Sequence, residues 1–180
     1  ERFGEGHFRI FDLWVQSDSQ IRIAGMWEPP VYQGNAGVIR RPVAVVIDPF
    51  QGYVITSKEL SWAHINGAAI SRSGERLVFV GEKRVPNTST APTAPTTLSY
   101  RVFAFDIKGL ELLSEKTRRE SRAVAFTAHE DVFLTLSYDG LYEWDIHHGY
   151  RSGALGTHEN NHNARLAVSP SGEQVAMTGY

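Results

Sequence analysis

The 180-residue sequence predicts an all-β fold built from repeated four-stranded antiparallel sheets. An aromatic residue followed by aspartate closes three β-patterned runs, and a degenerate copy closes a fourth. These pairs are Phe11-Asp12, Phe105-Asp106, Trp144-Asp145 and the degenerate Trp62-Ala63. The aromatic positions are spaced by roughly 40 to 50 residues, which is close to the period of a β-propeller blade. We therefore expect the chain to form blades of a propeller.

The clearest predicted blade occupies residues 122–155. It contains four short runs of β-forming residues, and Asp139-Gly140 between the second and third runs favours a tight hairpin turn. Four antiparallel strands in such a length make one blade. We expect Trp144 near the end of its third strand to pack between neighbouring blades, together with Phe11 and Phe105 at the corresponding positions of other blades.

Four further blade pieces are predicted, at about residues 1–28, 42–67, 68–116 and 164–180. A Ser-x-Ser-Gly-Glu turn at residues 71–75 recurs at residues 169–173, which indicates an internal repeat. The first piece is expected to hold the third and fourth strands of one blade, and the second piece three strands of another with no room for a fourth. The Thr/Pro/Ala-rich segment 85–97 is expected to be a flexible insertion.

These repeated residues resemble WD40 repeats. That family carries a Ser-Pro-x-Gly type of turn, an Asp-Gly turn and a Trp-Asp pair, which this chain matches at residues 169–172, 139–140 and 144–145. The resemblance implies a buried network of a histidine, a strand hydroxyl, a turn aspartate and a tryptophan, here His158, Ser137, Asp139 and Trp144. Such rings usually have seven or eight blades, so residues 1–180 are expected to form a single segment of a larger ring.

The composition argues against several classes of protein. The formal net charge is only −2 and no apolar run is long enough to span a membrane, so neither a nucleic-acid nor a membrane partner is expected from charge or hydropathy. The absence of cysteine removes disulfides, thiolate zinc ligands and cysteine nucleophiles. It fits a reducing compartment, and we expect an intracellular protein of the cytoplasm or nucleus that carries no cofactor.

One motif suggests catalysis. His158-Glu159-Asn160-Asn161-His162 matches the H-E-x-x-H pattern, which binds zinc when it lies on a helix and uses the glutamate as a general base. The asparagines and a nearby glycine disfavour a helix, so a loop is the preferred interpretation. The alternative is a metal-dependent hydrolase that uses His158, Glu159 and His162. No G-x-S-x-G elbow or P-loop is present, and we expect a protein that is not an enzyme.

Basic and aromatic residues suggest instead a surface that binds other proteins or peptides. Arg118, Arg119 and Arg122 are candidates for gripping an acidic peptide or phosphate, because guanidinium groups bind both bidentately. Trp27 and Tyr32 lie in a stiff aromatic segment of the kind that anchors interfaces, and Trp14 is also expected to be exposed. Too few aromatics flank the basic residues for nucleic-acid stacking.

The sequence therefore predicts a non-catalytic protein–protein interaction scaffold that is a subunit of a larger complex. A substrate receptor in an assembly of the ubiquitin ligase type is a further alternative. Because one fold hosts many functions, this prediction rests on the family resemblance and on the lack of catalytic motifs.

Overall fold

The computed structural model describes residues 7–17, 20–28, 43–50, 52–59, 64–85, 97–117, 120–153 and 164–178. These residues form fourteen β-strands and no helix. The strands make three four-stranded sheets and one two-stranded sheet, which we name A to D in chain order. All pairs within them are antiparallel, so the predicted all-β architecture of four-stranded sheets is confirmed.

The four sheets follow one another along the chain. Sheet A contains β1 (His7–Ser17), β2 (Gln20–Glu28), β3 (Val43–Asp48) and β4 (Tyr53–Glu59). Sheet B contains β5 (His64–Ile70), β6 (Arg76–Val85), β7 (Thr97–Asp106) and β8 (Glu111–Thr117). Sheet C contains β9 (Ser121–Phe126), β10 (Val132–Ser137), β11 (Gly140–Asp145) and β12 (Gly149–Gly153). Sheet D contains β13 (Arg165–Val168) and β14 (Val175–Thr178).

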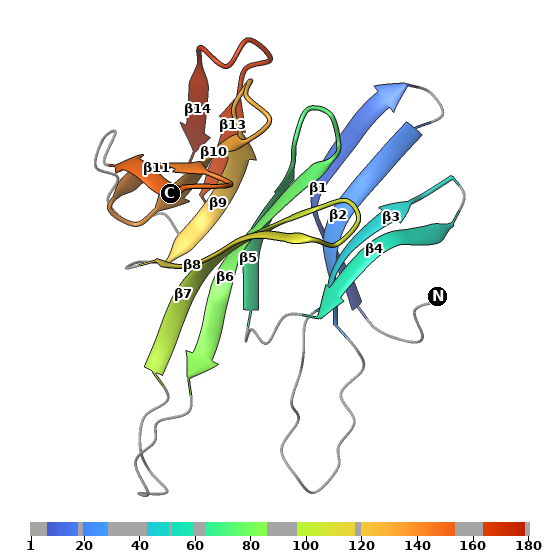
Figure 1. Cartoon of the computed structure of the whole chain (residues 1–180), viewed down its shortest axis with the longest axis horizontal. Coiled ribbons are helices and arrows are strands. Elements are labelled where there is room, and N and C mark those ends of the chain that lie inside the picture. The colour runs from blue at the N-terminus through green and yellow to red at the C-terminus, as the bar shows by residue number, and fades with distance from the viewer. Residues whose placement is uncertain are drawn as a thin grey trace, which may run out of the picture.

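The first strand of each sheet forms an inner row from which the sheets fan out (Figure 1). Strand β1 lies beside β5, β5 beside β9, and β9 beside β13. Within a sheet, each strand pairs with the next one in sequence. This is the arrangement of propeller blades around an axis that the first strands line.

The turn after the inner strand has the same geometry in sheets B and D. The backbone N–H of Ser71 donates to the carbonyl five residues later at 2.9 Å, and Ser169 does the same at 2.9 Å. Each serine Oγ accepts a hydrogen bond of 3.1 Å from the backbone N–H of that same later residue. Gly74 and Gly172 both have φ of 77°, a left-handed conformation that favours glycine. The repeated sequence therefore forms one turn twice.

A second recurrent turn follows the third strand of sheets A, B and C. Its first residue is an aspartate whose Oδ1 accepts the backbone N–H two residues later, at 2.9 Å for Asp48, 2.9 Å for Asp106 and 2.8 Å for Asp145. An aspartate in this position mimics a backbone turn and stops the strand. These three aspartates therefore mark equivalent positions in the three sheets.

The apolar core lies between sheets. Between A and B it includes Trp14, Met26 and Phe105, and the Phe79 and Phe105 rings stack at a centroid distance of 5.5 Å. Between B and C it includes Val80, Phe133 and Trp144, with the last two rings stacked at 6.2 Å. Between C and D it is built mainly from alanine and leucine. Sheet-on-sheet burial thus holds the described chain together.

One cross-strand row of side chains recurs on the side of each sheet that faces the preceding one. We call Ile70–Leu77–Phe105 in sheet B and Phe126–Phe133–Trp144 in sheet C the covered rows, since every member is buried. The register places Leu13–Ile23–Ile47 at the same positions of sheet A. No described residue packs a sheet against this open row, and the Leu13 side chain is 56% exposed.

The predicted division of the N-terminal third of the chain is wrong. Trp27 pairs with Val43, so residues 7–59 form one sheet rather than parts of two blades. The pair Phe11-Asp12 consequently lies in a first strand, at an irregularity of β1, and not at the end of a third strand. Trp14, expected to be exposed, is buried between sheets A and B. Of the predicted insertion 85–97, residues 86–96 lie outside the described residues.

Candidate functional site

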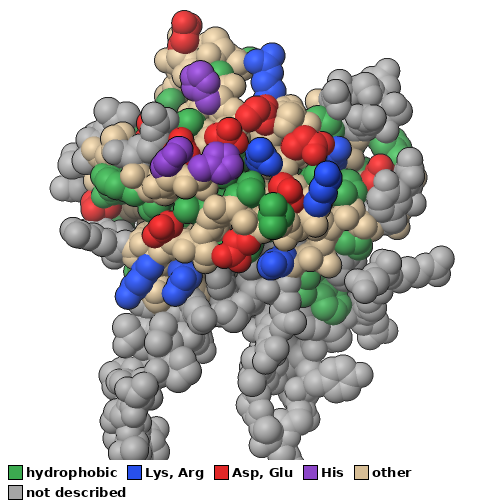
Figure 2. Space-filling view, in the orientation of Figure 1, with side chains coloured by type: hydrophobic (Ala, Val, Ile, Leu, Met, Phe, Trp, Pro, Cys, Tyr) green, Lys and Arg blue, Asp and Glu red, His purple; other side chains and the backbone are tan. Residues whose placement is uncertain are grey.

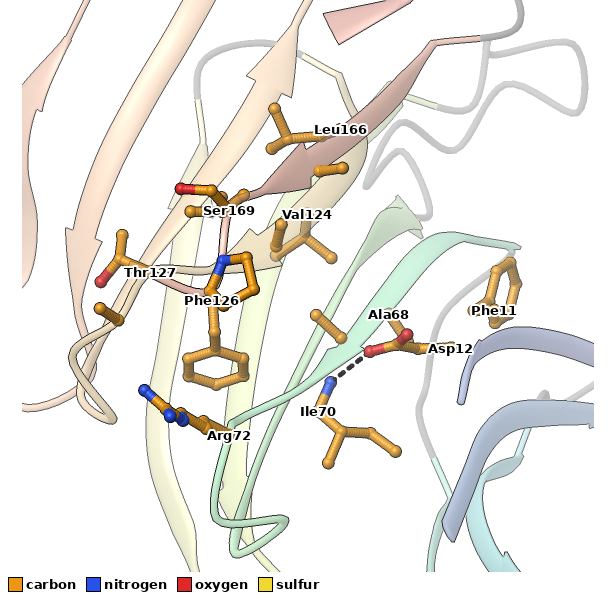
Figure 3. A pocket seen from close by; sticks show the side chains of 16 residues that line it. Phe11, Asp12, Ala68, Ile70, Arg72, Val124, Phe126, Thr127, Leu166 and Ser169 are labelled. Carbon is orange, nitrogen blue, oxygen red and sulfur yellow. Dashed lines mark hydrogen bonds between the residues drawn. The ribbon is translucent and has the colours of Figure 1, made fainter. Parts of the chain in front are cut away.

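Two pockets lie along the inner row, one where its strands begin and one where they end. The apolar pocket lies where the inner strands end and has a volume of about 390 Å³. Its walls come from all four inner strands and include Phe11, Ala68, Val124, Phe126 and Leu166 (Figure 3). The polar pocket lies where the inner strands begin and also measures about 390 Å³. The two ends of the row therefore differ in chemistry.

Asp12 is a carboxylate in the wall of the apolar pocket. Its Oδ2 accepts the backbone N–H of Ile70 at 2.8 Å (Figure 3). Its Oδ1 accepts the backbone N–H of Leu13 at 2.9 Å. Burial raises the pKa of Asp12, and these two backbone hydrogen bonds offset only part of the increase. The carboxylate caps an amide at the free edge of β5, so it fastens sheet A to sheet B. Of the described residues that line this pocket, Asp12 is the one carboxylate.

The polar pocket gathers charged side chains from all four sheets. Its lining comprises Arg9, Ile10 and Phe11 of β1, His64 and Asn66 of β5, Glu82 of β6, Glu120 and Arg122 at β9, and Ala164 and Arg165 at β13. Three guanidinium groups thus face two carboxylates. With histidine counted as neutral, the lining carries a net charge of +1.

Hydrogen bonds hold part of the polar pocket in place. Nη2 of Arg122 donates to Oε2 of Glu120 at 3.0 Å, and Nδ2 of Asn66 donates to the backbone carbonyl of Ser121 at 3.2 Å. Nη1 of Arg9 lies 3.4 Å from Nε2 of His64. Arg9 and Arg165 are the two exposed arginines, while Arg122 is half-buried. The pocket therefore offers a fixed guanidinium and two accessible ones.

The predicted contact residues are only partly within the described chain. Arg122 lies in the polar pocket, on the inner strand β9. Arg118, Arg119 and Tyr32 lie outside the described residues. Trp27 lies on β2 and pairs with Phe8 and Val43, on the same side of sheet A as the open row.

The histidines of the H-E-x-x-H motif, His158 and His162, also lie outside the described residues, as does Glu159. In the part of the chain that the structure describes, no cluster of three histidine, aspartate or glutamate side chains could hold a metal ion. The prediction of a hydrolase is therefore not tested by the structure.

Part of the hydroxyl network that the WD40 resemblance implies lies within the described residues, whereas His158 lies outside them. The indole Nε1 of Trp144 donates to Oγ1 of Thr135 at 2.9 Å, not to Ser137. Ser137 instead exchanges a hydrogen bond of 3.1 Å with Ser121. Both pairs are buried and link β10 to a neighbouring strand, so their role in the described residues is to satisfy polar groups within sheet C.

The end of the molecule where the inner strands end carries a second group of charges. Glu130 accepts the backbone N–H of Ser73 at 2.8 Å and its Oγ–H at 2.6 Å, which links sheets B and C. Asp131 lies 3.4 Å from Nε of Arg76 and 3.5 Å from Nε2 of His147. On the face shown in Figure 2, histidines are mixed with both acidic and basic side chains, so no patch of one sign forms there.

Arg9, His64 and Arg165 were not predicted as site residues. Each stands at or near the start of an inner strand, where a first strand enters the ring. The Ser-x-Ser-Gly-Glu turn follows β5 and β13 and so indicates where these two strands begin, but it does not mark β1 and does not show that the strands converge.

Comparison with known proteins supports the fold. No family model and no curated protein sequence matches the chain. It is similar to the β-propeller domain of Cps50 (Swd1) from Myceliophteria thermophila, with a TM-score of 0.52 and 15% identity over 91% of this chain. It also matches the WD40 domain of Pan2 from Neurospora crassa, with a TM-score of 0.42 and 12% identity over 93% of this chain and 71% of that domain.

These likenesses extend to the fold alone. The chain has a WD40-like β-propeller fold, as its repeated motifs predict. It spans 63% of the Swd1 propeller domain, less than two thirds of that chain. The described residues contain no helix with the length and hydrophobicity needed to cross a membrane.

Proposed function

We propose that the chain is a non-catalytic protein-interaction scaffold whose polar pocket binds a peptide segment of a protein partner. The observation that carries this proposal is the convergence of side chains from four sheets at one end of the inner row. A site assembled from several blades has a rigid scaffold behind it, so little conformational entropy is lost when a ligand binds. Arg122, the one described member of the predicted arginine cluster, lines it.

The chemistry of the described residues supports binding rather than catalysis. Among the described residues that line the polar pocket there is no serine or cysteine nucleophile. Guanidinium and amide groups at this end are donors, and they match the carboxylate and carbonyl acceptors of a peptide. Trp27 and Tyr32 are proposed as additional anchors, and Arg118 and Arg119 as additional cations that bind the partner.

The wider context of this proposal follows from the composition. A cysteine-free chain without a single-sign charge excess suits a subunit of an intracellular protein complex in the cytoplasm or nucleus. The fold is consistent with this role, since propeller loops present variable contacts on a fixed frame.

Binding of the labelled chain to an array of random twelve-residue peptides tests the proposal. We expect saturable binding to a subset of peptides, reduced tenfold or more by combined Arg9→Gln and Arg165→Gln substitutions. The matched control is Lys108→Gln, an exposed cation in the turn between β7 and β8 at the opposite end of the sheets. Absence of any retained peptide, or equal loss in the control, would contradict the proposed function.

A further inference from the structure

The polar pocket has an uneven charge balance that bears on what it binds. Arg122 is paired with Glu120 at 3.0 Å, so this ion pair contributes no net charge. Arg9 and Arg165 have no carboxylate partner among the described residues. Glu82 is the remaining acidic group in the lining. Two accessible guanidinium groups thus face one carboxylate.

The two accessible guanidinium groups come from the first and the last strand of the inner row. Arg9 lies on β1 in sheet A and Arg165 on β13 in sheet D, and both line the same pocket. A ligand between them contacts both the first and the last sheet described. Two planar forks that approach from different strands suit an acceptor with two oxygen atoms.

On this basis, and resting on the proposed function, we infer that the polar pocket selects a peptide bearing an aspartate or glutamate side chain, with Arg9 and Arg165 as its direct contacts. The net charge of +1 on the lining matches a monoanion. A carboxylate offers two oxygen atoms, one for each accessible guanidinium, so a single side chain can pair with both arginines. Arg122 is not one of these direct contacts, since its guanidinium is bonded to Glu120 and is half-buried.

The inference is tested by fluorescence anisotropy with three labelled peptides that differ only at the centre of a Gly/Ser sequence, where they carry glutamate, glutamine or phosphoserine. The glutamate peptide is expected to bind at least tenfold more tightly than the glutamine peptide. Its affinity should fall about tenfold in each of Arg9→Gln and Arg165→Gln and remain unchanged in Lys108→Gln. Raising the salt concentration should weaken the glutamate complex more than the glutamine complex, because charges at an exposed pocket are screened.

Distinct outcomes separate this inference from the proposed function. Equal affinity for the glutamate and glutamine peptides, with both lost in the arginine variants, overturns the carboxylate selectivity and leaves the binding site standing. Tighter binding of the phosphoserine peptide likewise overturns the choice of a monoanion. Failure of all three peptides, while other peptides on the array are retained, overturns the inference alone. Near-ultraviolet circular dichroism of each variant verifies that these exposed substitutions leave the fold intact.

Discussion

Sheets A and B carry equivalent cross-strand rows on the same side, yet the two rows have different surroundings. In sheet B, Ile70 is 7% exposed because sheet A lies against it. In sheet A, Leu13 occupies the same register position and is 56% exposed, and its neighbours Ile10 and Val15 are similarly open. The difference lies in what covers the row and not in its residues, since both rows are apolar.

That comparison indicates what the open row is for. Scattered exposed hydrophobic residues are normal on a protein surface, whereas a contiguous set on one sheet face marks an interface. Because the covered rows pack against a sheet, the open row has the composition of a blade-to-blade interface.

The largest expected difference between the covered and the open row comes from a matched pair of alanine substitutions. Ile70→Ala removes a buried side chain from the core between sheets A and B, and it should lower the free energy of unfolding by about 2–5 kcal/mol. Leu13→Ala at the equivalent position should cost less than about 1 kcal/mol, since the side chain is already in contact with water. Urea denaturation followed by tryptophan fluorescence measures both. Equal losses would show that the open row is covered in solution.

The sequence predicts correctly those sheets in which an aromatic residue directly precedes the aspartate of the turn after the third strand. In sheets B and C, Phe105 and Trp144 directly precede the turn aspartate, so the aromatic pair marks the end of the third strand. In sheet A the equivalent residues are Ile47 and Asp48. The third strand ends at the turn aspartate whether or not an aromatic residue precedes it. A search for aromatic–aspartate pairs therefore misses Ile47-Asp48 and selects Phe11-Asp12, which lies in a first strand.

The polar pocket could be predicted only in part, because most of its residues are far apart in the sequence. Arg122 belongs to a local basic cluster, which a linear reading detects. Arg9 and Arg165 are isolated in sequence and meet only because four inner strands run side by side. Such long-range convergence depends on the ring geometry, and no local pattern encodes it.

The buried hydrogen bond between Trp144 and Thr135 in sheet C gives a second test of how burial affects stability, with a smaller expected effect. Thr135→Val keeps the shape of the side chain but leaves the Trp144 indole N–H without its acceptor in a buried setting. The expected loss is about 1–3 kcal/mol in the free energy of unfolding, the usual cost of an unsatisfied buried donor. Thr135→Ser, which retains the hydroxyl, is the control and should recover part of this loss. A valine variant as stable as the parent would show that water replaces the hydroxyl.

The link between sheets B and C at Glu130 should depend on pH. Burial raises the pKa of this carboxyl, but the hydrogen bonds from Ser73 and Ser71 and the charge of Arg76 outweigh it, so that the net pKa is lowered. A lowered pKa stabilises the folded state above the unfolded-state pKa, and the contribution disappears as the pH falls through the folded-state value.

Glu130→Gln should therefore destabilise the protein by about 0.5–1 kcal/mol at pH 7, a small figure because the group is partly solvated. The difference between variant and parent should shrink as the pH is lowered below about 4.5, the ordinary value for this carboxyl. Denaturation curves between pH 3 and 7 measure it. A stability difference that is constant over this range would mean that the negative charge of Glu130 does not contribute to the stability of the folded state.

The smallest effect on stability, and the sharpest test of the open row, is expected for Leu13→Lys. A lysine at a half-exposed position should change the free energy of unfolding by no more than about 0.5 kcal/mol. It should nevertheless reduce binding of an apolar fluorescent dye and lower concentration-dependent association in sedimentation velocity, because a charge at the centre of an apolar face must be desolvated on contact. Leu110→Lys is the matched control, since Leu110 is 65% exposed but lies in a turn of sheet B away from the row. If both variants reduce association equally, general surface charge explains the effect, and the open row has no special role as a packing face.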